Sequence, residues 1–432
     1  MKLSTEAPAP DGASAAAEGG PAPPNRGSLL VIFVTIFIDL LGFGMVLPLL
    51  PIYARSFGVD EHGWQIALLM SSFSAMQFVF APLWGRLSDH IGRRPVLIAG
   101  LLGSAVFYAL FGLAAVWKSL TWLFITRIGA GIAGATVSTA SAYIADVTTP
   151  KTRAKGMALI GAAFGLGFTF GPLIGAAALA FSQGEAAIGA SPWPGFTAAI
   201  LSATAMLLAI ALLPESVRPG GGQTHHPVLN LRSWGDALAC PSVPALLATS
   251  FVSVVSFGAF ETTLSLLLAS EKLPFRFSFP QVLLFFAFVG LTLSLAQGVL
   301  VRRLAARVEE VPLALAGCVA TILGFALLTY ASHLGRVPML MAATAVEVTG
   351  FSLLTPSVQS LISRRSDPAR QGGVMGVAQS ISAMARICGP LIAVPLFFRD
   401  PALPYWAAIA IMAVATGIFL VFGRKGKDFS AG

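Results

Sequence analysis

Five ionisable side chains lie inside long apolar runs of this sequence, where a charge is costly. They are three carboxylic acids and two arginines: Asp39, Glu261, Glu347, Arg127 and Arg386. At the centre of a membrane-spanning helix such a residue costs at least ~2.5 kcal/mol, so it usually faces a polar cavity and serves a function. Carboxyl and guanidinium groups can hold a polar ligand, and the acids can also carry protons. We therefore expect these five residues to line one pathway.

Asp39 lies about two turns into the first apolar run, FIDLLGFGMVLPLLP. Arg127 stands in the fourth run, in line with four small residues one to four turns further on: Gly131, Gly134, Ser138 and Ser141. A guanidinium does not easily lose its proton, so in a cavity it needs a carboxylate, and Asp39 is the expected partner. Such a pair would tie the protonation of Asp39 to occupancy of the cavity. The alternatives are an interfacial Asp39 on a short helix and a packing face from which Arg127 points outward.

Three more charged positions fall in the second half of the chain. Glu261 and Glu347 lie in the seventh and tenth apolar runs, and Arg386 lies in the eleventh. For Glu261 the alternative is a place near the outer end of its helix. Arg386 is either a cavity residue or a packing partner for one of the two acids.

A short polar segment, GRLSDHIGRRPVL from Gly85 to Leu97, joins the second and third apolar runs. Runs joined so tightly must be antiparallel neighbours. Gly85 and Gly92 are expected to let the backbone turn at a helix end. Three arginines mark this segment as cytoplasmic by the positive-inside rule: Arg86, Arg93 and Arg94.

Asp89 is the one acidic residue in that segment, and Asp146 closes the fourth run on the same side. With Arg93 they are expected to form a charge cluster beside an inner gate. Asp89 has a second expected position near Gly372 and Gly373, where the N-terminus of the eleventh helix favours an anion. The alternative is unpaired surface charge worth under ~1 kcal/mol.

The fifth run, GAAFGLGFTFGPLIGA, carries glycines in two rows. The rows are Gly161 with Gly165, and Gly167 with Gly171 and Gly175. Glycines four residues apart let a neighbouring helix approach closely, and Pro172 bends the segment.

The pattern G-x-L-x-D-x-x-G-R-R-P-x-L of the polar segment resembles the signature loop of the major facilitator superfamily. The first run and the segment TPSVQSLISRRSDPARQGGVMGV resemble tetracycline-efflux-like antiporters of that superfamily, and the resemblance spans Leu29 to Leu420. The order G-x-x-x-G-P-x-x-G in the fifth run resembles the family's antiporters more than its symporters. The departures are Ala158 and Ala176, where glycines often stand.

This resemblance implies a twelve-helix drug–proton antiporter whose two bundles rock about a central cavity. It implies a functional acid at Asp39 and an intramembrane cation at Arg127. It also implies that the cluster of Asp89, Arg93 and Asp146 holds the bundles together when the protein opens outward. The cargo is then a small amphipathic organic compound or drug, exported as protons enter.

Composition independently requires many membrane crossings. Of the 432 residues, 56% are hydrophobic and 11% are charged, with a mean hydropathy of +0.81, whereas soluble chains carry about a quarter charged residues. Twelve runs are long enough to span a bilayer. They begin near Leu29, Trp64, Pro95, Trp122, Lys155, Phe196, Val243, Phe279, Pro312, Pro338, Val374 and Tyr405. The predicted fold is an all-α membrane protein with twelve transmembrane helices in two pseudo-symmetric six-helix bundles.

Charge sets the predicted orientation. With both termini in the cytoplasm, 19 of the 27 Lys and Arg residues lie on the inner side and 6 on the outer side. The remaining two are the intramembrane arginines. The net charge of +8 is therefore a topology signal, and nucleic acid is excluded as a partner.

The two halves repeat one plan at a nearly constant offset. Gly171-Pro172 recurs as Gly389-Pro390, and Pro150 recurs as Pro368 at the same distance along the sequence. Pro95 recurs as Pro312 at a distance that is one residue shorter. The second copy of the polar segment has Ala306 in place of Asp89 and Glu309 in place of Gly92, so it keeps basic charge and loses the acid contact. The expected division is a disordered cytoplasmic tail over 1–27, bundles over 28–214 and 242–423, a linker over 215–241 and a tail over 424–432.

Rival functions fit the residues less well. An uptake symporter for a small metabolite on the same fold is the alternative, and the fifth-run pattern argues against it. A membrane enzyme lacks support because no His lies in a span and no Cys/His cluster exists, and no ATP-binding P-loop motif occurs.

No cofactor, metal site or disulfide is expected, since Cys240, Cys318 and Cys388 lie far apart and the pair His225-His226 stands in the linker. The expected partners are the small-molecule substrate, protons and the lipid bilayer. The expected state is a monomer in the cell membrane, which is the inner membrane in a Gram-negative source.

Overall fold

The computed structural model describes residues 26–148, 153–182, 190–216, 231–239, 242–367, 371–424 and 426. Several predicted features lie outside this range: most of both tails, most of the linker with its histidine pair, Pro150, Pro368 and Cys240. The boundaries drawn for the tails and the linker stay predictions.

The described chain is helical, contains no strand, and includes twelve helical spans long and apolar enough to cross a membrane. The first six are α1 (Arg26–Val46) with α2 (Leu50–Ser56), α3 (Trp64–Ile91), α4 (Arg93–Trp117), α5 (Leu120–Gly134) with α6 (Val137–Asp146), α7 (Arg153–Leu179) and α8 (Trp193–Leu212). A short helix, α9 (Leu231–Ala239), precedes the second half. The second six are α10 (Val243–Ala269), α11 (Phe279–Leu295) with η2 (Ala296–Val301) and α12 (Arg302–Leu304), α13 (Glu310–Leu334), α14 (Val337–Arg365), α15 (Gln371–Arg399), and α16 (Leu403–Ile418) with η3 (Phe419–Gly423).

The predicted fold class is confirmed, and every predicted span begins within three residues of the start of its helix. Two spans are interrupted. The first is broken between α1 and α2, as Pro48 and Pro51 near its outer end predict, and Pro51 lies in the first turn of α2. The fourth is interrupted at Ala135 and Thr136, so the small residues beyond Arg127 do not form one continuous helical face.

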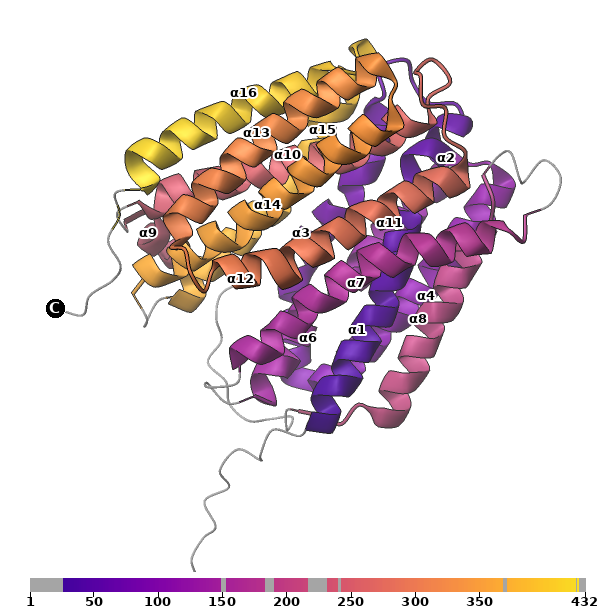
Figure 1. The fold of residues 1–432 in the computed structure, drawn as a ribbon. Helices are drawn as coiled ribbons and strands as arrows, with labels where there is room; N and C mark the ends of the chain where they lie inside the picture. Colours follow the sequence, from indigo (N-terminus) through magenta and orange to yellow (C-terminus); the bar gives the residue numbers. More distant parts are fainter. Residues whose placement is uncertain are drawn as a thin grey trace, which may run out of the picture.

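The spans form two bundles, one from α1 to α8 and one from α10 to α16 (Figure 1). Within the first, α1 packs on α7 and α8, and α4 packs on α5 and α8. Within the second, α13 packs on α14, and α10 packs on α15. The bundles meet along two lines, α7 against α11 and α3 against α15.

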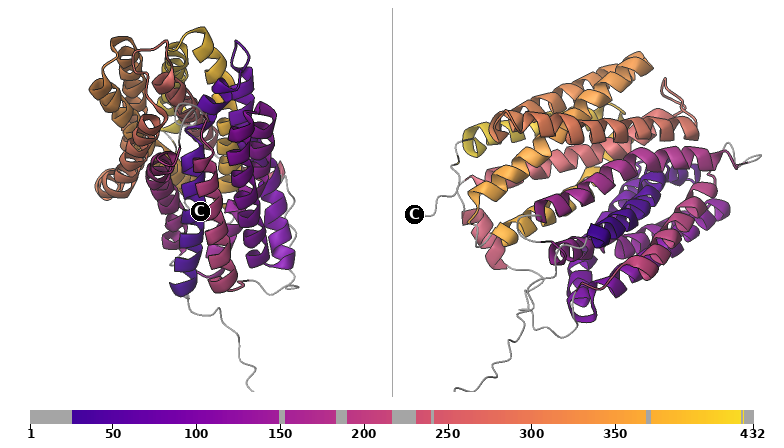
Figure 2. Two further views of the ribbon diagram at one scale, coloured as in Figure 1. Left: turned by 90° about the vertical axis from the view of Figure 1, so that its right-hand side faces the viewer. Right: turned by 60° about the horizontal axis from the view of Figure 1, so that its bottom comes forward.

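The hydrophobic cores show where the bundles are joined. We call the side where α1 begins and η3 ends the terminal side, and the opposite side the far side. On the far side one core cluster joins both bundles, with Tyr53 and Leu69 from the first and Phe260 and Phe286 from the second. On the terminal side each bundle has its own separate cluster. The bundles are therefore packed together on the far side and diverge towards the terminal side (Figures 1 and 2).

Candidate functional site

A small cavity lies where the two bundles join. Its volume is about 40 Å³, room for a few ordered water molecules. One wall comes from α7 and the others from α10 and α11; the lining residues are Phe168, Phe257, Phe260, Glu261, Phe286, Val289, Gly290 and Leu293. Glu261 is therefore a single carboxyl among aromatic and aliphatic side chains.

The backbone at this joint depends on a glycine and a proline. A Cβ at Gly290 of α11 would overlap the main chain of Phe168 on α7, so only glycine permits this approach. Pro172, one turn further along α7, has no N–H to offer the carbonyl of Phe168. The two helices thus meet backbone to backbone beside the cavity.

Arg127 lies on α5 with only 2% of its surface exposed. Its guanidinium carbon is 4.3 Å from the ring centroid of Phe73 and 6.0 Å from that of Phe43. Its Nε and Nη1 atoms find no hydrogen-bond partner among the described residues. The cation is held by aromatic faces, and two of its donors are left unused.

The expected ion pair between Arg127 and Asp39 does not form in the described part of the chain. Instead, the Asp39 carboxylate accepts a hydrogen bond of 2.9 Å from the Ser202 hydroxyl on α8. Gly42, one turn along α1, faces Tyr108 on α4 and Ala198 on α8. This side of α1 is therefore turned into the first bundle, which directs Asp39 away from the cavity.

Glu261 takes the place that was expected of Asp39. The charges of Arg386 and Arg127 both act on its carboxyl. Arg386 lies near the middle of α15 and is exposed, although its helix spans the membrane. Of the five predicted residues, Glu261 of α10 therefore lines the cavity, within electrostatic range of one cation from each bundle.

Glu347 does not belong to this group of lining residues. It is fully buried on α14, and a Cβ at Gly324 of α13 would lie only 2.6 Å from its Cα. Neither carboxyl oxygen has a hydrogen-bond partner within the described chain. Glu347 therefore lies inside the second bundle, packed against α13, and its part in proton coupling stays a prediction.

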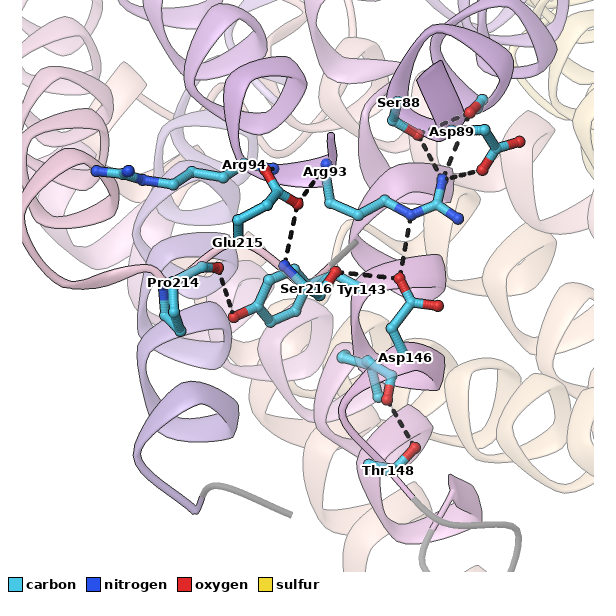
Figure 3. A network of polar contacts seen from close by, with 12 residues as sticks. Ser88, Asp89, Arg93, Arg94, Tyr143, Asp146, Thr148, Pro214, Glu215 and Ser216 are labelled. Atoms are coloured by element: carbon cyan, nitrogen blue, oxygen red, sulfur yellow. Dashed lines mark hydrogen bonds and ion pairs between the residues drawn. The ribbon is translucent and has the colours of Figure 1, made fainter. Parts of the chain in front are cut away.

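The predicted charge cluster on the terminal side is present (Figure 3). Arg93 Nη1 lies 2.5 Å from Asp89 Oδ1, and Arg93 Nε lies 3.2 Å from Asp146 Oδ2. Arg93 Nη1 also donates to the Ser88 hydroxyl at 2.6 Å. These residues lie on α3, α4 and α6, all in the first bundle, so in this conformation the cluster holds one bundle and not two.

Two details of the polar segment differ from expectation. Gly85 lies within α3, not at its end, and a Cβ there would meet nothing. Only Gly92 turns the chain, at φ 102°. Asp89 makes no hydrogen bond to Gly373 of α15 in the described structure, because its carboxylate is held by Arg93, four residues along the chain.

A residue that sequence reasoning missed completes this cluster. Glu215, just after α8, accepts hydrogen bonds from the backbone N–H groups of Arg93 at 2.8 Å and Arg94 at 3.1 Å. It therefore caps α4, where the helix dipole favours an anion. Beside it, the Ser216 hydroxyl donates to Asp146 at 3.0 Å (Figure 3). The sequence does show an acidic residue directly after the sixth apolar run, which could have suggested a helix cap. Nothing in the neighbouring sequence shows which helix N-terminus this residue caps.

The predicted glycine row of α7 packs against α1. A Cβ at Gly167 would lie 2.8 Å from Leu40 Cβ, one at Gly171 would lie 2.6 Å from the Leu41 carbonyl oxygen, and one at Gly175 would lie 2.6 Å from Met45 Cγ. Gly165, from the other row, faces Ser294 of the second bundle. The row serves close helix packing, as its spacing indicates.

Comparisons with known proteins agree on the family. The family model described as Major Facilitator Superfamily matches residues 32–390. The tetracycline resistance protein, class C, of Escherichia coli is 31% identical over 402 residues, covering 92% of this chain and 96% of that protein. The Homo sapiens major facilitator superfamily domain-containing protein 10 is 30% identical over 462 residues, covering 92% of each chain.

Solved structures show the same fold. The crystal structure of the human organic anion transporter MFSD10 (TETRAN) superposes with a TM-score of 0.67 at 27% identity, covering 92% of this chain and 99% of that one. A bacterial homologue of the human lysosomal transporter Spinster, in an inward-facing and unoccupied conformation, superposes with a TM-score of 0.71 at 15% identity. It covers 96% of this chain and 100% of that one.

Proposed function

The chain belongs to the Major Facilitator Superfamily, whose members are transporters and not enzymes, and we propose that it exports a small amphipathic organic compound in exchange for protons. The terminal side is then cytoplasmic, in keeping with the 19 basic residues assigned to it against 6 on the far side. The bundles share a hydrophobic core on the far side and have separate cores on the terminal side, so with this orientation the structure would correspond to an inward-open state of an alternating-access cycle.

The observation that carries the proposal is the position of Glu261 in the cavity wall at the joint of the bundles, where the charges of Arg127 and Arg386 both act on its carboxyl. A substrate bound against the ionised carboxyl is released when a proton neutralises that carboxyl. Proton and substrate then compete for one group, which is the requirement for exchange. Each proton entering with the membrane potential contributes ~2.3 kcal/mol per 100 mV when one net charge crosses.

Asp39 and Glu347 take no part in this competition as we propose it. Asp39 is hydrogen-bonded inside the first bundle, and Glu347 is buried inside the second. Gly167, Gly171 and Gly175 let α7 pack close to α1, and Pro172 lies within the same stretch of α7, so this motif supports the cavity wall.

A second candidate, proton-coupled symport of an organic anion, is favoured by the two unpartnered donors of Arg127. An anionic head group would supply their missing acceptors, since arginine pairs well with carboxylates and phosphates. Protonation of Glu261 would then leave two unopposed cations and strengthen anion binding. Proton and anion would travel together, the opposite linkage to exchange.

Purified protein in liposomes distinguishes the two functions without regard to its orientation. A pH difference of one unit is worth about 1.4 kcal/mol, or tenfold accumulation for an electroneutral one-to-one carrier. Exchange concentrates the probe on the acidic side of the membrane, and symport concentrates it on the alkaline side.

We would use tetracycline and fluorescein as the neutral-to-zwitterionic and anionic probes, with Glu261→Gln liposomes as the control. We expect tetracycline to accumulate on the acidic side. Accumulation of either probe on the alkaline side would replace the proposal with symport. Accumulation that survives Glu261→Gln would remove Glu261 from the mechanism.

A further inference from the structure

The second copy of the polar segment, at the terminal-side end of α11, carries three arginines without a partner in the protein. Arg302 and Arg303 lie on α12, which continues the line of α11 (Figure 1), and Arg307 lies in the turn that follows. All three side chains are exposed, and none makes an ion pair or a hydrogen bond within the described chain. Three guanidinium groups therefore stand together at the end of a span with no acceptor.

The equivalent segment of the first bundle contains its own acid. There Asp89 pairs with Arg93 at 2.5 Å, whereas the second copy has Ala306 in the place of Asp89. Of the two acids that follow in the second copy, Glu310 is already paired with Arg364 at 2.8 Å. The one remaining acid cannot balance three arginines, so this end of the second bundle keeps an excess of positive charge.

An exposed apolar stripe on α11 and η2 leads to these arginines. Leu291, Leu295 and Val299 follow one another at four-residue steps, all exposed, and Arg303 comes at the next step. Leu293 lines the cavity, and two further residues turn a helix by about 200°, so Leu295 lies on the opposite side of α11. No other helix covers that side of a membrane-spanning segment, so the acyl chains of the bilayer contact it.

A basic cluster at the end of an apolar stripe fits a phospholipid with a negatively charged head group. Guanidinium groups bind phosphate through paired, charge-assisted hydrogen bonds. We propose that Arg302, Arg303 and Arg307 bind the head group of an anionic phospholipid from the terminal-side leaflet, and that one of its acyl chains lies along the apolar stripe. The excess of positive charge selects this lipid over a zwitterionic one.

The bound lipid fixes the end of a span that also forms a wall of the cavity. Phe286 and Leu293 of α11 line that cavity, on the side of the helix opposite the stripe. The inference concerns the bilayer and holds whichever substrate and coupling ion the carrier uses.

Native mass spectrometry of the purified full chain measures the binding directly, because each bound lipid adds its own mass. The chain is titrated in detergent with dioleoyl phosphatidylglycerol as the anionic probe and dioleoyl phosphatidylcholine as the zwitterionic probe. The test variant combines Arg302→Gln, Arg303→Gln and Arg307→Gln. The matched control makes the same change at three exposed far-side arginines, as Arg276→Gln, Arg336→Gln and Arg399→Gln.

We expect the parent to bind one phosphatidylglycerol about tenfold more tightly than phosphatidylcholine. Its affinity should fall about 100-fold in the test variant, since each arginine near the membrane surface accounts for about fivefold, and by less than twofold in the control. Equal binding of the two lipids would overturn the proposal, as would parent-level affinity in the test variant. An equal loss in the control would also overturn it, because the effect would then reflect net charge alone.

The test variant removes inner-side positive charge, which also guides insertion. If it fails to insert, Arg303→Gln alone replaces it, since this change leaves the other two arginines in place. The expected loss of phosphatidylglycerol affinity is then about fivefold, and an unchanged affinity would refute the site.

Discussion

Arg127→Met should make the protein more stable and abolish its coupled transport. The substitution removes a buried cation whose Nε and Nη1 have no hydrogen-bond partner in the described structure. It removes the cation–π interaction between the guanidinium carbon and the Phe73 ring centroid, 4.3 Å apart, which contributes about 2 kcal/mol when it is desolvated. It also removes the cost of burying a cation with two unsatisfied donors, which is several kcal/mol even after relaxation and exceeds what the distant charge of Glu261 returns. The net expectation is a gain of about 1–3 kcal/mol in the free energy of unfolding.

Thermal unfolding in detergent gives the measurement, with a thiol-reactive dye that reports exposure of the fully buried Cys318. A gain of about 1 kcal/mol in a bundle of roughly 200 residues corresponds to a rise of about 2–4 °C in Tm. Arg336→Met, at an exposed far-side position, is the matched control and should leave Tm unchanged within about 1 °C.

Transport completes the test. We expect probe accumulation driven by a pH difference to vanish in Arg127→Met and to be partly retained in Arg127→Lys, which keeps the charge without the planar guanidinium. A lower Tm in Arg127→Met would refute the reasoning, since it would mean that the cation holds the bundle together. A normal pH-driven accumulation would show that Glu261 works without the positive charge of Arg127.

Further outcomes follow from the same contacts. Glu261→Gln should abolish pH-driven accumulation but retain probe exchange between equal pH, whereas Asp39→Asn, which can keep its hydrogen bond, should retain both. Gly92→Ala should lower the free energy of unfolding by about 2 kcal/mol or more, because its φ is 102° and the Glu215 carboxylate occupies the space that a Cβ would need. Gly85→Ala, inside α3 with nothing near the added methyl group, should raise the free energy of unfolding by about 0.5–1 kcal/mol. Equal changes in thermal stability for the two variants would contradict a turn at Gly92 that requires glycine. Gly290→Ala should push α11 from α7 and slow transport with normal insertion; an unchanged rate would show that this contact is dispensable.

The spans and their order follow from the sequence, because crossing a bilayer depends on local hydropathy and length. The twelve starts, the repeat that relates the two halves and the contact of Arg93 with Asp89 were all predictable for that reason. Asp89 lies four residues before Arg93, so little beyond the local chain is needed to bring them together. The glycine row of α7 was likewise predictable as a packing face from its spacing alone.

The composition of the cavity was decided by the tertiary structure. Sequence gives the depth of an intramembrane residue but not the direction in which it points, since each residue turns a helix by about 100°. Asp39 and Arg127 have suitable depths, yet α1 turns Asp39 towards Ser202. Glu261 comes within electrostatic range of Arg127 only because the second bundle packs against the first. Glu347 does not line the cavity, because Gly324 lets α13 pack closely over it.

The same limit applies at the terminal side. Glu215 caps α4 across 122 residues of chain, and nothing in its local sequence identifies that helix start. Which charges pair within a bundle, and which bundle faces meet, depend on helix neighbours set by long-range packing. The sequence alone therefore determined which residues enter the membrane and how deep they lie. Only the tertiary structure decided which of them face one another, because that depends on helix rotation and on contacts between distant segments.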